Sequence, residues 1–537
     1  MKTLNHFNYP YPSTKNSAFA KNGMVATSQP LASQAGLDIL KKGGNAIDAA
    51  IATAACLTVV EPTSNGIGGD AFALVWTKGK LHGLNGSGRS PETISINSVK
   101  ESGHQEIPKY GWIPVTVPGV PDAWAELSDK FGRLPFRDVL QPAIDYARNG
   151  FPVSPTLSKF WKKAFNVFRE NLTDDMFSEW FKTFAPKERA PEPGEIWSSE
   201  NHARTLEKIA ESNAGSFYRG ELADEISSFS KQNGGYLSAD DLASHQSEWI
   251  EPISVNYRGY DIWEIPPNGQ GLVALQALNI LKGFEFNEKE SVDTYHKQIE
   301  AMKLAFADGQ AHITDEKHMR FSPEFLLSEE YAQYRRQLVE ETAQIPDAGE
   351  PALSGTVYLA AADNEGNMVS FIQSNYMGFG SGLVVPGTGI ALQNRGHNFS
   401  MDPDHVNTLA GGKRSYHTII PGFMSQGGQP VGPFGVMGGF MQPQGHVQVV
   451  MNTIDFDLTP QAALDAPRWQ WHKDRKVEVE NRFPHHIAQR LTEKMHDVTI
   501  QLEPNSFGRG QIIWRDTETG VLIGGTESRT DGAVSCW

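Results

Sequence analysis

Apolar positions along the chain recur with two periods, the spacing of a helix and the alternation of a strand, which together predict a mixed α/β protein. A short apolar run at 24–28 predicts a strand, and helical spacing follows over 30–42 and ends before two glycines. Asn45 can cap a second helix over 46–60, a run rich in Ala and Thr. Small residues along a whole helix suit close packing, so we expect this helix to lie directly on a sheet.

Residues 154–190 have a different character, because aromatic side chains recur there at helical spacing with Lys and Glu between them. Those aromatic positions are Phe160, Trp161, Phe165, Phe168, Phe177, Trp180, Phe181 and Phe184. Helical spacing returns over 273–284 and 292–309. We interpret the aromatic segment as a helical region that buries its apolar stripe and takes no part in chemistry.

The strongest strand signal lies in the last third of the chain. Two apolar runs, 356–363 and 368–374, flank a short polar turn in which Gly366 can take a positive φ, and this pattern is typical of a β-hairpin. Both strands are apolar on both faces, as expected inside a layered core. Two further apolar runs, 382–387 and 389–394, are predicted to extend the same sheet.

The hairpin register predicts which residues meet at its open end. If a four-residue turn sets the register, Asp363 faces Met368 and Thr356 faces Asn375. The hydroxyl of Ser374 then lies next to that of Thr356. The Pro-, Gly- and Ala-bearing stretch 343–354 before this strand has little periodicity, and we expect it to be an exposed connector.

A threonine at the head of a strand, directly after Gly355, suits a backbone bond that is strained and then broken. In an N-to-O acyl shift, Oγ of Thr356 attacks the preceding carbonyl and forms an ester, and water then releases a new chain that begins with threonine. The freed α-amino group, with an unperturbed pKa of about 7.7 to 8.0, can act as the base for its own hydroxyl. Ser374 can orient these groups, and the backbone N–H groups of Gly438 and Gly439 can stabilise an oxyanion.

Composition and charge narrow the possible partners. The 537 residues carry a formal net charge of -16, and no Lys/Arg run is long enough to suggest a strand of nucleic acid. No apolar run approaches the ~20 residues that span a bilayer, and the first residues lack the apolar core of a signal peptide. The two cysteines, Cys56 and Cys536, are not a disulfide framework. We therefore expect a cytoplasmic protein that binds neither nucleic acid nor membrane.

Signatures of other enzyme classes are missing from the sequence. It contains no G-x-S-x-G elbow, no H-E-x-x-H metal helix and no G-x-x-x-x-G-K-[ST] phosphate loop. The glycine-rich run 378–382 resembles a dinucleotide loop, but a predicted strand follows it where a helix should. His485-His486 and the acidic pair Asp402 and Asp404 are better interpreted as surface or loop residues than as metal ligands. We expect no metal and no cofactor.

Taken together, these residues resemble the γ-glutamyltranspeptidase family over nearly the whole chain, from about Gly23 to the C-terminus. The segment 24–72 is similar to the opening segment of that family, including its glycine-rich loop at 66–70. Arg89, in the run Arg-Ser-Pro, matches the place where the family has an arginine that binds the substrate carboxylate. The resemblance implies the four-layer αββα sandwich of N-terminal-nucleophile hydrolases, an α/β (α+β) fold.

The same resemblance assigns the catalytic residues. Thr356 matches the nucleophile, Ser374 the position of a second threonine, and Gly438-Gly439 the oxyanion glycines. Cleavage between Gly355 and Thr356 would give a large subunit, 1–355, and a small subunit, 356–537, intertwined in one domain as a heterodimer.

The chain departs from the family where a glutamyl head group would be bound. An acidic residue that holds the ammonium is replaced by Asn398, with Arg395 and His397 nearby, and a neutral or basic pocket holds an ammonium less well. His417 and Thr418 stand where a pair of serines holds the carboxylate. The segment 400–413 is short, which implies that a lid loop is missing and points to the branch that includes some cephalosporin acylases.

Three functions therefore remain open. The first is a self-processing γ-glutamyl transferase or glutathione hydrolase that passes an acyl group from Thr356 to water or an amine. The second is a glutaryl acylase of the cephalosporin type, whose substrate carboxylate could pair with Arg89 or Arg395. The third is an uncleaved relative that only binds ligands.

Overall fold

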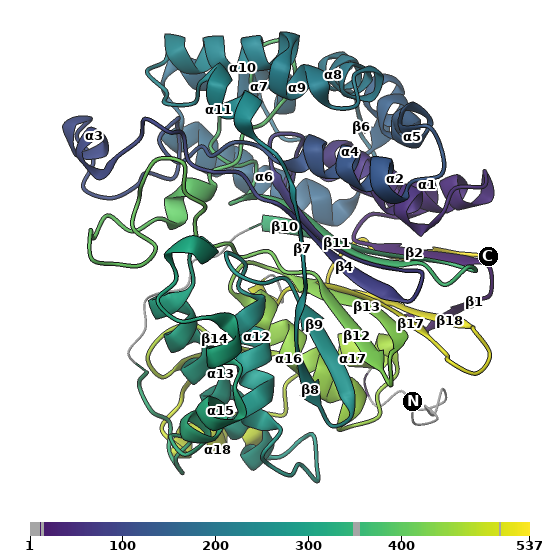
Figure 1. Cartoon of the computed structure of the whole chain (residues 1–537), viewed down its shortest axis with the longest axis vertical. Coiled ribbons are helices and arrows are strands. Elements are labelled where there is room, and N and C mark those ends of the chain that lie inside the picture. Colours follow the sequence, from purple (N-terminus) through teal and green to yellow (C-terminus); the bar gives the residue numbers. More distant parts are fainter. Residues whose placement is uncertain (1–10, 12–14, 347–354, 504–505) are drawn as a thin grey trace.

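Two seven-stranded sheets lie face to face, and helices cover both outer faces, in the computed structural model of the chain (Figure 1). The structure describes residues 11, 15–346, 355–503 and 506–537, so residues 347–354 of the predicted connector lie outside the described residues. One sheet has the order β19 (Ala533–Cys536), β2 (Gly23–Thr27), β10 (Gly355–Asp363), β11 (Met368–Tyr376), β3 (Asp70–Thr77), β4 (Lys80–Gly86) and β7 (Glu248–Ile250). The other has the order β1 (Ala18–Ala20), β18 (Leu522–Thr526), β17 (Arg509–Arg515), β13 (Gln429–Met437), β12 (Gly422–Gln426), β9 (Tyr260–Glu264) and β8 (Ile253–Tyr257).

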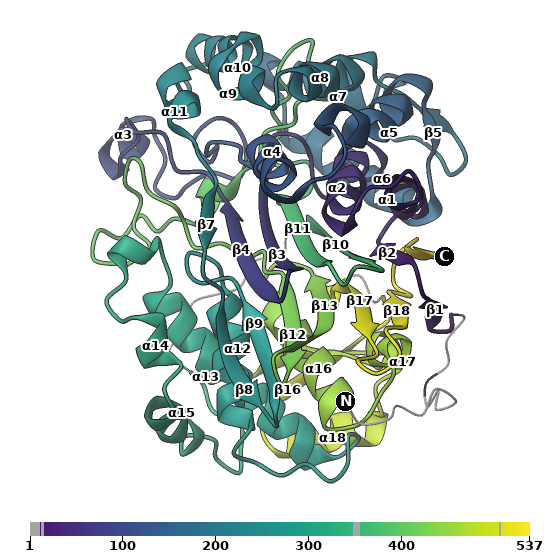
Figure 2. The ribbon, with the colours of Figure 1, turned by 45° about the vertical axis from the view of Figure 1, so that its right-hand side comes forward.

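Each outer face has its own group of helices, as the two ribbon views show (Figures 1 and 2). The sheet that contains β10 is covered by α1 (Pro30–Lys41), α2 (Ala46–Val60), α4 (Val120–Phe131) and α5 (Phe136–Asn149), with α6 (Pro155–Asn171), α7 (Ser178–Phe184), α8 (Glu200–Glu211), α9 (Gly215–Arg219), α10 (Glu221–Gln232) and α11 (Ala239–Ser244) beyond them. The sheet that contains β13 is covered by α12 (Gly271–Leu281), α13 (Val292–His312), α14 (Pro323–Leu326), α15 (Glu329–Arg336), α16 (Met441–Ile454), α17 (Pro460–Asp465) and α18 (His485–Glu493). Smaller elements are α3 (Ile96–Glu101), the pair β5 (Phe151–Pro152) and β6 (Ile196–Trp197), and a third sheet of β14 (Trp469–Trp471), β15 (Lys476–Glu480) and β16 (Asp497–Gln501).

Three apolar layers hold these elements together. Phe72, Met368, Phe423 and Ile513 belong to the layer between the two sheets, and all four are fully buried. The two other layers lie between each sheet and its own helices. The four-layer αββα prediction is confirmed, because each sheet buries both of its faces.

Helix α2 shows why the sequence pattern near the N-terminus was informative. Asn45 accepts hydrogen bonds from the N–H groups of Ile47 and Asp48, and the Asp48 side chain accepts one from Asn45 N–H in return. This capping box starts the helix where the sequence predicts it. Every residue of α2 is buried, and its alanines let it pack closely between the sheet and the outer helices.

The aromatic segment forms α6 and α7 and packs onto the loop that follows β11. Phe379, in that loop, lies with its ring centroid 5.1 Å from Trp180, 5.6 Å from Trp161 and 4.7 Å from Phe184. Phe379 has a positive φ of 36°. The aromatic stripe therefore fixes the chain at the open end of the β10–β11 hairpin.

Two sequence predictions about this sheet are wrong in detail. Ala362, not Asp363, pairs with Met368, because the Asp363 carboxylate accepts N–H bonds within the turn and makes the loop one residue longer. A β-bulge between Gly355 and Val357 then shifts the pairing back, so that Gly355 faces Tyr376. The runs 382–387 and 389–394 share only one isolated bridge and do not extend the sheet as strands, because glycines with positive φ turn the chain between them.

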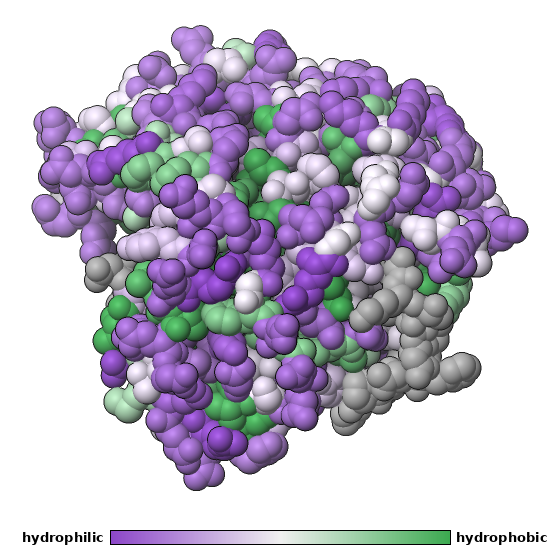
Figure 3. All heavy atoms as spheres, turned by 60° about the horizontal axis from the view of Figure 1, so that its bottom comes forward, coloured by the Kyte–Doolittle hydropathy of each residue, from purple (hydrophilic) through white to green (hydrophobic). Residues whose placement is uncertain are grey.

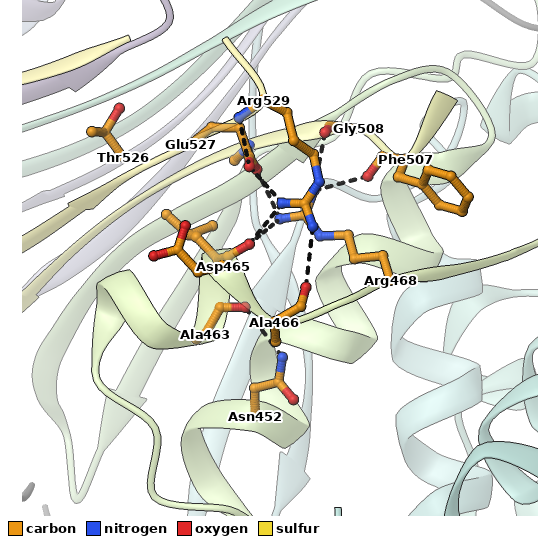
Figure 4. A network of polar contacts seen from close by, with 12 residues as sticks. Asn452, Ala463, Asp465, Ala466, Arg468, Phe507, Gly508, Thr526, Glu527 and Arg529 are labelled. Carbon is orange, nitrogen blue, oxygen red and sulfur yellow. Dashed lines mark hydrogen bonds and ion pairs between the residues drawn. The ribbon is translucent and has the colours of Figure 1, made fainter. Parts of the chain in front are cut away.

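A buried ionic network holds the C-terminal segment against the loop between α17 and β14 (Figure 4). Arg468 donates hydrogen bonds to Glu527 at 2.9 Å and to the carbonyls of Phe507 and Gly508. Arg529 pairs with Glu527 and with Glu480 at 2.6 and 2.5 Å. These side chains are at most 3% exposed, so the two arginines and two glutamates neutralise one another inside the core.

The face of the molecule shown in Figure 3 is mainly hydrophilic, with smaller apolar areas between the polar side chains. Some exposed large apolar side chains, such as Phe19, Ile196 and Leu502, are far apart in the sequence, whereas Phe321 and Phe325 stack on each other with ring centroids 5.4 Å apart. In the part of the chain that the structure describes, no helix has the length and apolar character needed to cross a membrane.

Candidate active site

Thr356 lies in the bulge at the start of β10, fully buried between the two sheets. Its Oγ donates a hydrogen bond to Ser374 Oγ at 3.1 Å, so the two hydroxyls meet as the sequence predicts. Ser374 Oγ also accepts the N–H of Tyr376 at 2.8 Å, and Tyr376 has a positive φ of 75°. A bulge and a left-handed residue at the same strand ends are typical of a site that aims side chains for chemistry.

Asp70 lies directly beside Ser374, because the two residues are paired in the β3–β11 register. One carboxylate oxygen of Asp70 accepts from Gln393 Nε2 at 2.9 Å and from the N–H of Gly88 at 3.1 Å. The other lies 3.0 Å from His417 Nε2. Both oxygens of Asp70 are therefore held within the protein.

Burial governs the protonation of Asp70 and His417. It raises the pKa of Asp70 to about 7, although Arg395 opposes the shift. It lowers the pKa of His417 well below its usual range, and the positive charges of Arg395 and Arg414 add to that effect. Because Ile419 N–H donates to His417 Nδ1 at 3.4 Å, we assign the proton of the neutral imidazole to Nε2, facing Asp70.

Arg395 begins a short 3₁₀ turn (Arg395–Asn398) and is 1% exposed. Its Nη1 donates to Thr418 Oγ at 2.8 Å, and its guanidinium lies over the ring of Tyr376, 4.3 Å from the centroid. Asn398 accepts from the Tyr376 hydroxyl at 2.5 Å and donates to the carbonyl of Tyr416 at 3.0 Å. Of the predicted binding residues, Arg395 and Asn398 thus contact Tyr376 directly, and Thr418 contacts Arg395.

Gly438 and Gly439 form the turn from β13 into α16, with positive φ values of 141° and 61°. A side chain at these positions would be strained, which explains the glycine pair. The amide of Gln270 donates both to Gly439 O at 2.9 Å and to Thr418 O at 2.6 Å. Gln270 therefore joins the predicted oxyanion glycines to the segment that contacts Arg395.

The glycine-rich loop predicted at 66–70 packs against the end of β11. A Cβ at Gly69 would come within 2.6 Å of both Asn375 Oδ1 and Ser374 O, and one at Gly66 within 2.8 Å of Asn375 Nδ2. Only glycine allows this approach. The loop thus closes the side of the site next to Ser374.

Arg89, the predicted carboxylate-binding arginine, lies in the loop after β4 and already has several partners. Its Nη1 contacts Asp315 at 2.7 Å and Gly412 O at 3.2 Å, and its Nη2 contacts Glu248 at 3.3 Å. Its side chain is 32% exposed. The role of Arg89 in binding stays a prediction.

Three residues of this site were not singled out in the sequence. Asp70 had a signal, since an acidic residue directly after a glycine-rich loop opens an otherwise apolar strand. Tyr376 and Gln270 had none, because their roles depend on the bulge and on a contact between distant segments.

A cluster of His296, Glu300 and His496 lies outside this site, in the layer of α13. His296 Nδ1 and His496 Nε2 are hydrogen-bonded to each other at 2.8 Å, and Lys303 Nζ donates to Glu300 at 2.7 Å. Internal hydrogen bonds and the lysine charge account for these groups, so they are better explained as packing than as metal ligands. His485 lies 3.2 Å from the carbonyl of Asn481, and Asp402 caps its own loop.

The four-layer fold, with a threonine at the head of a central strand and a second hydroxyl beside it, is that of an N-terminal-nucleophile hydrolase. The profile of the family described as "Gamma-glutamyltranspeptidase" matches residues 32–537. The chain belongs to the γ-glutamyltranspeptidase family, a family of enzymes.

Comparisons with individual proteins support this assignment over the whole chain. The "Glutathione hydrolase-like YwrD proenzyme" of Bacillus subtilis is 40% identical over 95% of this chain and 98% of its own length. The "Oxamate amidohydrolase proenzyme" of Klebsiella pneumoniae is 33% identical over 97% and 99%. The crystal structure of a cephalosporin acylase from Bacillus halodurans has a TM-score of 0.96 and 65% identity, and the match covers 100% of this chain and 99% of that one.

Proposed function

We propose that the protein is a self-processing amidohydrolase whose nucleophile is the hydroxyl of Thr356. The observation that carries this proposal is the contact between Thr356 Oγ and Ser374 Oγ at the head of β10, in a chain of this family. Three similar proteins are named proenzymes or acylases, which fits a precursor that is cleaved before it acts.

In the first step, Thr356 Oγ attacks the carbonyl carbon of Gly355, and the peptide bond is replaced by an ester. Water then hydrolyses the ester, which leaves a carboxylate on Gly355 and a free amino group on Thr356. In each turnover this amine takes the hydroxyl proton as Oγ attacks a substrate amide, and the proton passes to the leaving amine. Water or a second amine then releases the acyl group from Oγ.

The small-molecule substrate is proposed in two forms. One is a γ-glutamyl amide, because the family name and the glutathione hydrolase-like relative point to it. The other is a glutaryl-type amide, which has the carboxylate and lacks the ammonium, because Asn398 offers no negative charge and a cephalosporin acylase is 65% identical. The named substrate of a further relative, oxamate, is likewise an amide with a carboxylate and no ammonium.

Processing is expected to leave the fragments 1–355 and 356–537 together as a heterodimer. Strand β10 pairs on one side with β2 from the N-terminal fragment and on the other with β11 from its own fragment, so the two fragments share one sheet. Cleavage of one peptide bond removes none of these hydrogen bonds.

The proposal is tested with a denaturing gel and intact-mass analysis of the purified protein. We expect two fragments, the smaller beginning at Thr356. Thr356→Ala should remain one chain and lose hydrolysis of any substrate by about a thousandfold or more, because both steps need the same Oγ. Thr356→Ser, which keeps a hydroxyl, should still be cleaved.

Two results would contradict this function. One is a single full-length band for protein with Thr356 intact, which together with ligand binding would support the non-enzymatic alternative. The other is hydrolysis by Thr356→Ala at a rate close to that of the wild type.

A further inference from the structure

The guanidinium of Arg395 is buried and only partly bonded. Arginine has five N–H donors, and burying them without partners is costly. Nη1 donates to Thr418, but among the residues that the structure describes, Nε and Nη2 have no hydrogen-bond partner. A site that keeps two donors of a buried arginine unpaired is arranged for an acceptor that comes from outside the chain.

The two unpaired nitrogens lie on the same edge of the planar group. Nε and Nη2 are the pair through which arginine binds both oxygens of one carboxylate. Nη1, on the other edge, is occupied by Thr418, and the ring of Tyr376 covers one face. The free edge of Arg395 therefore has the geometry for a bidentate carboxylate.

Among the residues that the structure describes, no carboxylate takes this place. Asp70 acts on Arg395 through its charge, but its own oxygens are held by Gln393, the Gly88 N–H and His417. Asn398, at the other end of the same turn, already has partners for its side-chain amide: its oxygen accepts from Tyr376 and its N–H group donates to Tyr416. An ammonium group here would face the charge of Arg395, and the nearby Asp70 carboxylate already has partners for both of its oxygens.

Arg395 is also connected to the nucleophile on one side and to the predicted oxyanion glycines on the other. Tyr376, which lies under its guanidinium, donates its N–H to the same Ser374 Oγ that accepts from Thr356. Thr418, its hydrogen-bond partner, is joined through Gln270 to Gly439. Arg89, in contrast, would have to exchange its contacts with Asp315 and Glu248 for a substrate.

We propose that the Nε and Nη2 edge of Arg395 binds the carboxylate of the acyl group, so that Arg395 selects amides whose acyl part carries a carboxylate and no ammonium. The assignment rests on the proposed amidohydrolase function of Thr356. It makes Arg395, rather than Arg89, the main determinant of acyl specificity.

Three nitroanilides test the assignment: glutaryl, γ-glutamyl and butyryl, of which the last lacks a carboxylate. For the wild type we expect kcat/KM to be highest for the glutaryl compound. Arg395→Gln should lower that value by about a hundredfold or more, because a buried charge-assisted pair is lost, and should lower the butyryl value far less. Arg395→Lys should recover part of the loss. Arg89→Gln should lower kcat/KM for the glutaryl compound less than Arg395→Gln does. Arg320 is an exposed arginine, and Arg320→Gln should leave that value unchanged.

Several outcomes separate the two proposals. If the wild type hydrolyses none of the anilides and is not cleaved, the amidohydrolase function fails. If it is active but Arg395→Gln lowers the glutaryl and butyryl values equally, or Arg89→Gln has the larger effect, the Arg395 assignment is overturned. A wild-type preference for the γ-glutamyl compound overturns it as well.

If Arg395→Gln does not fold or is not cleaved, inhibition of the wild type decides. Glutarate should then compete with substrate more strongly than L-glutamate or than butyramide, which has no carboxylate. Equal inhibition by glutarate and butyramide would overturn the assignment.

Discussion

Two buried arginine sites in the C-terminal half of the chain, the network around Arg529 and the single residue Arg395, use their charge in different ways. In the network of Figure 4, every side-chain nitrogen of Arg529 has an acceptor, from Glu480, Glu527 or the carbonyls of Leu464 and Ala466. Arg395 is 1% exposed and the Arg529 side chain 3%, but two nitrogens of Arg395 have no acceptor among the described residues. Similar burial with unequal pairing separates a group that holds the fold from a group arranged for a ligand.

The pKa shifts of Glu527 and Arg395 also distinguish the paired network from the partly paired arginine. Burial by itself would raise the pKa of Glu527, but Arg468 and Arg529 outweigh it and lower the pKa to about 2. Burial lowers the pKa of Arg395 to about 10, and the charge of Asp70 only partly opposes this. The network is therefore most stable with all its charges present, whereas Arg395 gains most from a further anion.

The largest effect on stability is expected when Arg529 is replaced. Arg529→Met leaves Glu480 and Glu527 short of a buried partner, which should reduce the free energy of unfolding by about 3 to 5 kcal/mol. Arg395→Met, the matched control, should change it by about 1 kcal/mol or less, because few bonds are lost. Urea unfolding at neutral pH measures both. Equal losses in the two variants would remove the distinction between the sites.

Glu527 should make stability fall at low pH. Its folded pKa of about 2 lies below the usual value of 4.5, so its contribution is fully present above pH 4.5 and is lost as the pH falls towards 2. Unfolding midpoints between pH 7 and pH 2 should show a shallower decline for Glu527→Gln than for the wild type.

Glu341→Gln is the control for this pH dependence, because the Glu341 side chain is 99% exposed. It should follow the wild-type decline. A Glu527→Gln variant with an unchanged slope would show that Glu527 does not gain its stability from the two arginines.

Sequence alone predicted more of the fold than of the site. The helix over 46–60 and the β10–β11 hairpin follow from local signals, a capping box and a glycine turn, and both are present. The register was wrong by one because Asp363 closes a longer turn, a side-chain effect that hydrophobic alternation does not record. Thr356 and Ser374 nevertheless meet, since the bulge at Gly355 compensates for the shift.

The substrate side of the site was harder to predict. Whether an arginine is paired depends on residues hundreds of positions away, such as Asp315 for Arg89, and no local pattern contains that information. The sequence therefore left both Arg89 and Arg395 as candidates for the substrate carboxylate, with Arg89 favoured by its match to the family. Their different pairing in three dimensions is what separates them.

The smallest effect is expected at Ser374, where the hydrogen bond from Thr356 bears on the rate as well as on stability. Ser374→Ala removes the acceptor of the Thr356 hydroxyl, and losing one such bond should lower kcat/KM by about tenfold. Ser370→Ala is the matched control, since Ser370 lies on the same strand, is equally buried and bonds the Tyr358 hydroxyl. It should lower stability by a similar amount and leave kcat/KM within about twofold. If both variants slow hydrolysis equally, the loss at Ser374 reflects strand packing, and Ser374 does not orient the nucleophile.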